Sequence, residues 1–207
     1  MCSKLESRTS RNVVIIGHSG VGKSSLINML CPSADAPVSN DVFGCTTTER
    51  AYLCDLGRQQ SCMVHDTIGL EEGSWGFLWA PKAERRLKSY LKKSKPHLVV
   101  YCMPGVRRYL KKSYGRSFNK FKSMAGKVPI VVVVNHLEDS RHSEDWWSAN
   151  LDVLRKIGIP ESTQHACVTT LPEVDFMYEI YGSSKRGIYD SSREAVKALI
   201  MNNLPQY

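Results

Sequence analysis

The sequence lacks the features of membrane-spanning and secreted proteins. No apolar stretch reaches the roughly 18 residues that a transmembrane helix needs, and the opening MCSKLESRTSRN contains no apolar core of a signal peptide. The glycine that N-myristoylation requires after the initiator methionine is absent, and the C-terminal LPQY is no prenylation motif. These absences predict a cytoplasmic protein with no transmembrane segment.

The sequence also lacks paired cysteines. Its seven cysteines are an odd number, scattered at positions 2, 31, 45, 54, 62, 102 and 167. This spacing argues against a disulfide framework and against a zinc motif. We expect reduced cysteines that mostly serve packing.

Acidic residues are scarce in two segments. The net charge of +8 is concentrated in 82–95 and 107–122, which are rich in Lys and Arg. Such runs could attract a membrane surface, an acidic partner or nucleic acid, although a solvated helix face is the commoner explanation. No nucleic-acid motif accompanies them, so we predict no nucleic-acid partner.

Apolar runs alternate with helical segments along the whole chain, and this pattern predicts an α/β fold with helices on both faces of a mostly parallel sheet. We expect a flexible N-terminal tail over 1–11 and a single domain over 12–204, since no linker or repeat divides its 207 residues. The expected strands are 13–16, 51–56, 62–65, 98–103, 128–134 and 166–169. The expected helices are 23–30, 83–93, 118–125, one capped by Ser143 that carries Trp147, Leu151 and Leu154, and a last helix. In that last helix Ser191 and Glu194 form a capping box, and Ala195, Leu199 and Ile200 face the core.

A phosphate-binding motif follows the first expected strand. The sequence GHSGVGKSS satisfies G-x-x-x-x-G-K-[ST] and lies between a strand and a helix, as its mechanism requires. Backbone N–H groups of such a loop point at phosphate oxygens, Lys adds a positive charge, and the following helix directs its N-terminus at the anion. The Ser24 hydroxyl can also bind Mg²⁺. The predicted phosphate-binding residues are His18, Ser19, Gly20, Val21, Gly22, Lys23, Ser24 and Ser25.

Two further segments complete the expected phosphate and metal site. In HDTIGL, Asp66 and Gly69 form D-x-x-G, in which the carboxylate holds the Mg²⁺ shell and the glycine N–H contacts the terminal phosphate. The segment FGCTTTER lies between the two motifs, where a threonine hydroxyl could close over Mg²⁺. We favour Thr47 as the switch I residue and metal ligand, with Thr46 and Thr48 as alternates.

With these motifs in place, the chain resembles a P-loop GTPase of the translation-factor-related class. Five segments carry the resemblance in order: GHSGVGKSS, the threonines of 46–48, DTIGL, NHLED and CVTT. Within that class the chain is similar to septin, chloroplast-import and immune-associated GTPases. It looks closest to fungal proteins described only as G-domain-containing, which share GCT, DTxGLxE, a Cys-Met strand end and a Trp-Trp helix. The resemblance implies a three-layer G domain with a six-stranded sheet, binding of GTP and GDP, and Mg²⁺ as cofactor.

The resemblance also implies where the base binds. Guanine-reading proteins usually carry N-K-x-D, whereas this chain has Asn135 and then His136, with Glu138 at the position of the acid. Asp139 offers a second solution, and the choice between the two carboxylates stays open. After the last strand, Thr169 and Thr170 occupy the place where a backbone N–H contacts guanine O6.

The sequence lacks the glutamine that many GTPases use for hydrolysis. In many GTPases a glutamine after D-x-x-G orients the attacking water, but here that residue is Leu70. No catalytic residue is therefore assigned, and we expect slow turnover. His65, which precedes Asp66, is expected to turn away from the metal site because side chains alternate along a strand.

The glycines and aromatic residues of 70–80 suit a movable segment that binds a protein effector, and a homodimer through the nucleotide face is a further expectation. Three functions compete. The first is a GTP-dependent switch with slow hydrolysis, the second a nucleotide-stabilised assembly module with little hydrolysis, and the third, less favoured, an ATPase or kinase.

Overall fold

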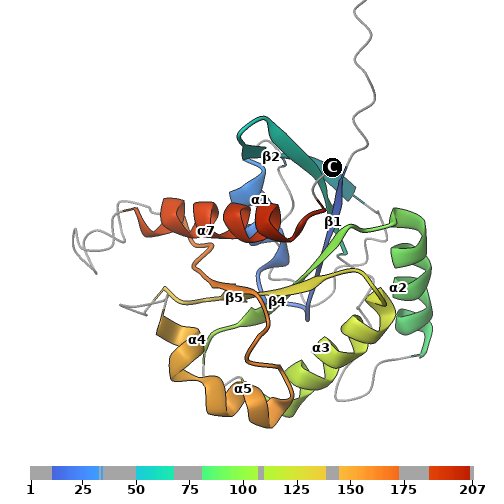
Figure 1. Cartoon of the computed structure of the whole chain (residues 1–207), viewed down its shortest axis with the longest axis vertical. Coiled ribbons are helices and arrows are strands. Elements are labelled where there is room, and N and C mark those ends of the chain that lie inside the picture. Colours follow the sequence, from blue (N-terminus) through green and yellow to red (C-terminus); the bar gives the residue numbers. More distant parts are fainter. Residues whose placement is uncertain are drawn as a thin grey trace, which may run out of the picture.

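The computed structural model describes residues 11–32, 34, 50–67, 81–106, 110–138, 145–172 and 187–205. These residues form one six-stranded sheet in the order β2-β3-β1-β4-β5-β6. The strands are β1 (Asn12–Ile16), β2 (Arg50–Gly57), β3 (Gln60–Asp66), β4 (Leu98–Pro104), β5 (Ile130–Asn135) and β6 (His165–Cys167). Only the β2–β3 pair is antiparallel, whereas β3, β1, β4, β5 and β6 are parallel neighbours. The expected mostly parallel six-stranded sheet is confirmed (Figure 1).

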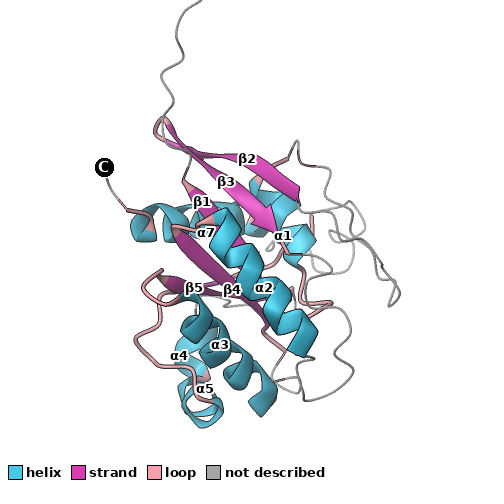
Figure 2. Ribbon diagram, turned by 90° about the vertical axis from the view of Figure 1, so that its right-hand side faces the viewer, coloured by secondary structure: helices cyan, strands magenta, loops and turns pink. Residues whose placement is uncertain are grey.

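Helices cover both faces of the sheet, which makes three layers (Figures 1 and 2). The helices are α1 (Lys23–Leu30), α2 (Pro81–Ser94), α3 (Lys112–Ala125), α4 (Trp146–Ala149), α5 (Leu151–Ile157) and α7 (Ile188–Asn203). Alternate side chains of β1 divide between the two cores: Val13 and Ile15 pack with α1 and α7, whereas Val14 and Ile16 pack with α2 and α3. Among the described residues, no helix is both long and apolar enough to cross a bilayer.

The central strands are continuous apolar runs because both of their faces are covered. All residues of β4 are buried, and so are Val131–Asn135 of β5. Parallel strands place their carboxyl ends at one edge of the sheet. Residues that follow β1, β3 and β5 therefore lie close together, as the candidate site requires.

The last helix corrects two sequence predictions. It begins after Gly187 rather than at a capping box, so that Ser191 lies within its first turns. Ala195 is exposed, and the core-facing residues are Ser192, Val196, Leu199 and Ile200. The chain can turn at Gly187 because its φ of 83° suits glycine. The helix therefore starts one turn earlier than its polar side chains suggested.

Two other helices also differ from the prediction. The expected helix over Trp147, Leu151 and Leu154 is divided into α4 and α5, because Asn150 adopts a non-helical conformation and its side chain donates to the Trp146 carbonyl at 2.7 Å. Helix α3 begins at Lys112, earlier than the expected 118. No disulfide joins the cysteines in the described part of the chain, and Cys31, Cys54, Cys62 and Cys102 are buried.

Candidate functional site

The loop after β1 is fixed by glycines at two positions where no side chain fits. A Cβ on Gly17 would lie 2.2 Å from the Cys102 carbonyl oxygen, and a Cβ on Gly22 would lie 2.2 Å from Asn135 Nδ2. Both residues also have positive φ, 150° and 87°, which glycine adopts without strain. The backbone of the loop is thereby held against β4 and β5, and α1 begins directly after it at Lys23.

Lys23 is buried at the N-terminus of α1. Its Nζ donates to the carbonyl oxygens of Gly17 at 2.5 Å and His18 at 3.1 Å. The ammonium group therefore lies inside the loop, where the positive end of the helix dipole also points. Ser24 and Ser25, in the first turn, are half-buried, whereas Ser19 and Gly20 are exposed at the tip of the loop. A buried cation at a helix N-terminus is chemistry suited to a phosphate group.

The side chain of His18 is directed away from the tip of the loop and toward α3. Its Nε2 lies 2.9 Å from Ser117 Oγ, and its ring makes an edge contact with Tyr114. Burial, and secondarily the charge of Lys23, lowers the pKa of His18 below its ordinary value. His18 therefore connects the phosphate loop to α3.

Asp66 ends β3 beside β1 and is 4% exposed. The next residue, Thr67, is fully buried, and its hydroxyl donates to the Ile15 carbonyl at 2.7 Å. Thr67 thereby joins the end of β3 to the strand that carries the phosphate loop. The Asp66 carboxylate and the Ser24 hydroxyl are hard oxygen donors, which fit Mg²⁺, a metal that proteins usually hold with one or two carboxylates and substrate phosphates.

Asn135 is the residue that joins the different parts of the site. Its Nδ2 donates to the Val21 carbonyl at 3.1 Å and to Thr170 Oγ1 at 3.0 Å, and its Oδ1 accepts from the Thr170 N–H at 3.2 Å. The side chain is fully buried at the end of β5. One amide therefore ties the phosphate loop to the segment after β6.

The two polar residues described after Asn135 lie beside different parts of the site. His136 has a φ of 65°, and its Nε2 would be 3.3 Å from a Cβ on Gly22. Glu138 accepts a hydrogen bond from Thr169 Oγ1 at 3.1 Å. Of the two candidate carboxylates, Glu138 is thus placed beside the segment after β6, whereas Asp139 lies outside the described residues.

The backbone N–H groups after β6 have partners within the protein. Thr169 donates its N–H to Ser192 Oγ at 3.2 Å, Thr170 to Asn135 Oδ1, and Leu171 to Thr169 Oγ1 at 3.2 Å. Pro172 has no N–H. Over residues 169–172 this arrangement leaves no spare backbone donor for the guanine O6 contact expected at Thr169 or Thr170.

Cys102 is a residue that the sequence did not single out for the site. Its thiol donates to the Val21 carbonyl at 3.3 Å, the oxygen that also accepts from Asn135. Cys102 is fully buried at the end of β4. In the sequence, Cys102 could have been found from its position two residues before the end of an apolar strand. The structure places that strand, β4, beside β1. Ser117, the partner of His18, had no comparable signal in the sequence.

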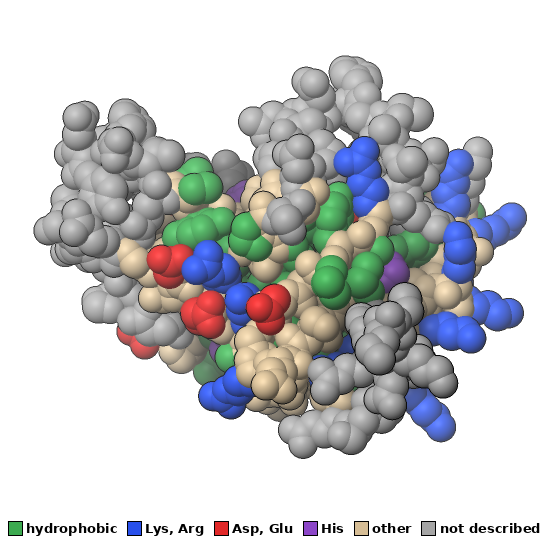
Figure 3. Space-filling model, turned by 90° about the horizontal axis from the view of Figure 1, so that it is seen from above, with side chains coloured by type: hydrophobic (Ala, Val, Ile, Leu, Met, Phe, Trp, Pro, Cys, Tyr) green, Lys and Arg blue, Asp and Glu red, His purple; other side chains and the backbone are tan. Residues whose placement is uncertain are grey.

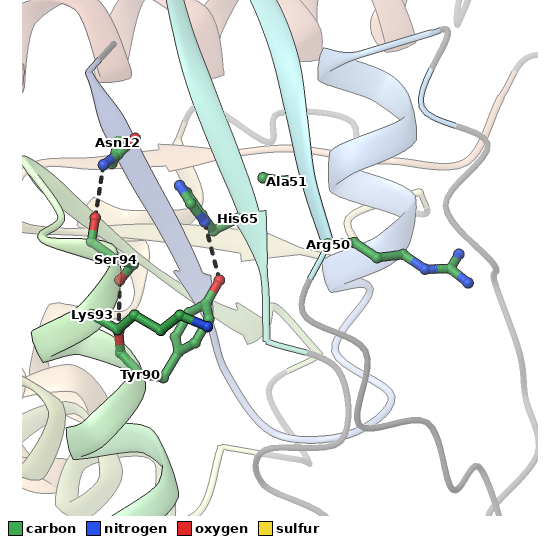
Figure 4. A pocket seen from close by; sticks show the side chains of 7 residues that line it. All are labelled: Asn12, Arg50, Ala51, His65, Tyr90, Lys93 and Ser94. Carbon is green, nitrogen blue, oxygen red and sulfur yellow. Dashed lines mark hydrogen bonds between the residues drawn. The ribbon is translucent and has the colours of Figure 1, made fainter. Parts of the chain in front are cut away.

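His65 lies away from the site, as the alternation of β3 predicts. Its Nδ1 is 3.1 Å from the Tyr90 hydroxyl on α2. Both residues line a cavity of about 310 Å³ between α2 and the β2–β3 pair (Figure 4). The other lining residues are Asn12, Arg50, Ala51, Lys93 and Ser94. His65 therefore belongs to this cavity and not to the phosphate site.

Several predicted site residues lie outside the described residues. These are Gly69, Leu70, Asp139 and the threonines of 46–48. The described site contains the phosphate loop, Asp66, Asn135, His136, Glu138, Thr169 and Thr170.

The chain matches a known protein family over most of this region. Residues 12–136 match the model of the family described as 50S ribosome-binding GTPase. Among curated proteins, the chain is similar to GTPase Der of Buchnera aphidicola subsp. Acyrthosiphon pisum (strain APS), with 23% identity over 146 residues. That match covers 70% of this chain but only 31% of the relative's length.

Solved structures share the fold. Toc33 from Arabidopsis thaliana in complex with GDP and Mg²⁺ aligns with a TM-score of 0.62 at 14% identity, over 94% of this chain and 86% of Toc33. A variant of Era from Aquifex aeolicus bound to GDP and AlF₄⁻ aligns with a TM-score of 0.62 at 16% identity, over 95% of this chain and 57% of Era. Both of these structures contain a guanine nucleotide bound to the same fold.

Proposed function

Because the chain belongs to the 50S ribosome-binding GTPase family, we propose that it binds GTP and GDP with Mg²⁺ and acts as a nucleotide-dependent switch with slow hydrolysis. The observation that carries this proposal is the Asn135 amide, which joins the phosphate loop to the segment after β6. A site for phosphate alone needs only the loop and Lys23. The additional connection supports a role for the end of β5 in binding a base.

In this proposal the phosphates lie at the N-terminus of α1, where the loop N–H groups and Lys23 bind them. On binding, the Lys23 ammonium exchanges its contacts with Gly17 and His18 for phosphate oxygens. Ser24 and Asp66 hold Mg²⁺, which neutralises phosphate charge, and Thr47 is the third proposed ligand. The N–H of Gly69 contacts the terminal phosphate.

Guanine is proposed to be read by an acidic side chain after β5. The carboxylate accepts two hydrogen bonds from the guanine N1 and N2 edge, which adenine cannot donate in the same pattern. Thr169 holds Glu138 in place, and this contact supports Glu138 over Asp139. His136, beside Gly22, covers the base in this arrangement.

The base assignment is tested by calorimetry of the full chain with Mg²⁺ and a panel of GTP, GDP, ATP and ADP. We expect the guanine nucleotides to bind at least about a hundredfold more tightly, a difference of about 2.7 kcal/mol. If ATP binds as tightly as GTP, guanine recognition by residues 135–139 is wrong. Parallel titrations of Glu138→Gln and Asp139→Asn identify the carboxylate, since only the variant of the reading residue loses the preference for guanine.

Slow hydrolysis is proposed because Leu70 cannot orient water as a glutamine does. A partner chain is the proposed source of the missing group, through a homodimer that forms across the nucleotide face. Dimerisation has a precedent in the fold, since one similar structure is a dimerisation-deficient variant of Toc33. The segment 70–80 is proposed to contact a protein effector.

The second candidate function is an assembly module that binds nucleotide without meaningful turnover, which Leu70 also favours. Single-turnover hydrolysis of GTP at increasing protein concentration separates the two functions. A rate that rises with dimerisation supports the switch. An absence of product at every concentration, with nucleotide bound, supports the assembly module.

A further inference from the structure

One face of the molecule carries a strong excess of positive charge. Helix α2 and the residue after it present a set of basic side chains at the surface: Arg85, Arg86, Lys88, Lys92, Lys93 and Lys95. The one acidic residue in 81–95 is Glu84, which is half-buried and forms ion pairs with Lys88 at 3.1 Å and with Lys120 of α3 at 2.6 Å. Within 81–95 the basic residues therefore greatly outnumber the acidic ones.

Helix α3 continues the same surface. Residues 110–127 contain no Asp or Glu, and α3 itself carries Lys112, Arg116, Lys120 and Lys122. The Lys120–Glu84 ion pair joins α3 directly to α2, and both helices pack on the same face of the sheet. Viewed from above, Lys and Arg side chains gather on the side where α2 lies (Figure 3). We call the exposed Lys and Arg side chains of α2 and α3 the basic face.

We propose that the basic face docks the protein onto a bilayer of anionic lipids. A bilayer presents a broad field of negative charge, and each Lys or Arg near such a surface adds about 1 kcal/mol of attraction, or about fivefold in affinity. Two adjacent helices of 14 residues, each about 21 Å long, can place several of these side chains near the lipid at once.

The composition of the basic face favours lipid over nucleic acid. Lysine outnumbers arginine on both helices, and lysine is a compact, hydrated charge that lacks the planar fork with which arginine binds phosphates and bases. Single-stranded nucleic acid is usually bound by exposed aromatic side chains that stack on bases. Within the described part of the chain, the exposed large hydrophobic residues are Leu53 and Leu171, and neither is aromatic or on this face.

A cavity beside α2 adjoins the basic face. It lies between α2 and the β2–β3 pair, on the same side of the sheet as the basic face, and Lys93 belongs to both. Its lining contains Arg50, Lys93 and His65 but no Asp or Glu. Lys93 is therefore the basic side chain that the cavity shares with the basic face, whereas Arg50 points away from the other lining residues (Figure 4).

The experiment measures binding of the full chain to vesicles of phosphatidylcholine, with and without phosphatidylserine, by co-sedimentation at several salt concentrations. Three matched double variants are compared. Each loses one exposed arginine, and each loses one lysine that lies in the last turn of a helix. Arg86→Gln/Lys92→Gln changes α2 and Arg116→Gln/Lys122→Gln changes α3. Arg58→Gln/Lys156→Gln is a control that changes exposed residues on neither helix.

We expect the native chain to bind only the vesicles with phosphatidylserine, and less tightly as salt rises. Each helix variant should lose about 25-fold in affinity, at about fivefold per side chain, and the control should change less than about twofold by the same rule. Equal losses in all three variants would show that net charge alone acts, and would overturn the proposal. It is also overturned if the native chain binds neither vesicle, binds both equally, or binds an RNA duplex more tightly at the same salt.

Discussion

The two ends of the candidate site are built from different parts of the chain. At the phosphate end, glycines with positive φ, a buried lysine and a helix N-terminus hold the backbone in one position. At the base end, the contacts come from side chains: Asn135, Glu138, Thr169 and Thr170. In the proposed function, the phosphate end binds a group that many nucleotides share, whereas selectivity depends on a few side-chain contacts. Substitutions at the two ends should therefore have different effects on nucleotide affinity and on the preference for GTP over ATP.

The largest effect is expected for Lys23→Ala. The variant loses a charged donor to phosphate, and two charge-assisted hydrogen bonds are worth together about 4 kcal/mol, or roughly a thousandfold in affinity. GTP and ATP should weaken by the same factor, because the lysine lies at the phosphate end. Calorimetry with both nucleotides measures this, and thermal unfolding checks that the variant is folded. Unchanged affinity in a folded protein would rule out the phosphate site.

Gly22→Ala tests how firmly the two ends are joined. The new Cβ would meet Asn135 Nδ2 at 2.2 Å, so the amide must move away from Val21 and Thr170. Gly20→Ala is the matched control, since Gly20 also has a positive φ, 79°, but no atom lies within 4 Å of the added Cβ. The control should lose about 1–2 kcal/mol of unfolding free energy from backbone strain alone. We expect Gly22→Ala to lose at least about 2 kcal/mol more in urea unfolding, together with nucleotide binding. Similar losses in both variants would contradict the close contact.

Glu138→Gln should affect the base end alone. The amide oxygen can still accept from Thr169 Oγ1, but the second terminal atom is now a donor, so glutamine cannot accept from guanine N1 and N2 with two oxygens as a carboxylate does. We expect the preference for GTP over ATP to fall by about a hundredfold, or about 2.7 kcal/mol. ATP affinity should stay within about twofold because the phosphate contacts are retained. A competition assay measures the ratio. Loss of both affinities would mean that Glu138 has a structural role.

A smaller effect is expected for Cys102→Ala. The substitution removes one of the two donors to the Val21 carbonyl and leaves Asn135 in place. We expect a loss of about 1 kcal/mol of unfolding free energy and an equal, few-fold weakening of GTP and ATP. Cys102→Ser retains a donor at this position and should lie closer to the native protein. If Ala and Ser weaken binding equally, the hydrogen bond contributes nothing.

The smallest effect concerns pH. Since the pKa of His18 is lowered in the folded state, the unfolded chain binds a proton more readily below about pH 6.5. His18 therefore makes its full contribution to the free energy of unfolding above about pH 6.5. That contribution is lost as the pH falls through the folded-state pKa. Urea unfolding at about pH 7.5 and pH 5.5 should show a smaller difference for His18→Asn than for the native chain. Ser117→Ala keeps the histidine and its burial, and should retain the dependence. An unchanged pH response in His18→Asn would assign it to other groups.

The position of the phosphate loop could be predicted from the sequence, whereas the side-chain contacts at the base end could not, for a physical reason. Glycine spacing and a buried strand impose local constraints, so GHSGVGKSS could be placed between β1 and α1 without tertiary information. The contacts of Asn135 join residues 114 and 35 positions apart, and no local pattern predicts which carbonyl or hydroxyl they meet. The same holds for Cys102 and Val21.

The fold was predictable where burial sets the pattern. The apolar runs of β1, β4 and β5 have no other stable location than the middle of the sheet, and the predicted ends of β1 and β4 were correct within one residue. Helix starts were less predictable. Gly187 begins α7 through its backbone conformation, although Ser191 and Glu194 offered a better cap. The added first turn brings Tyr189 against the core, a contact that local preference does not predict.

The central position of β1 determines the order in which the site can form. The first strand of the chain lies between β3 and β4, so it has no parallel neighbour until those later strands have been synthesised. The antiparallel β2–β3 pair can form early because its strands are joined by a short turn. Contacts of large sequence separation form slowly, and the Val21–Asn135 contact joins residues 114 positions apart. On a ribosome that synthesises this chain, the phosphate loop therefore emerges before β3, β4 and β5, and it reaches its final conformation only after they have folded beside it.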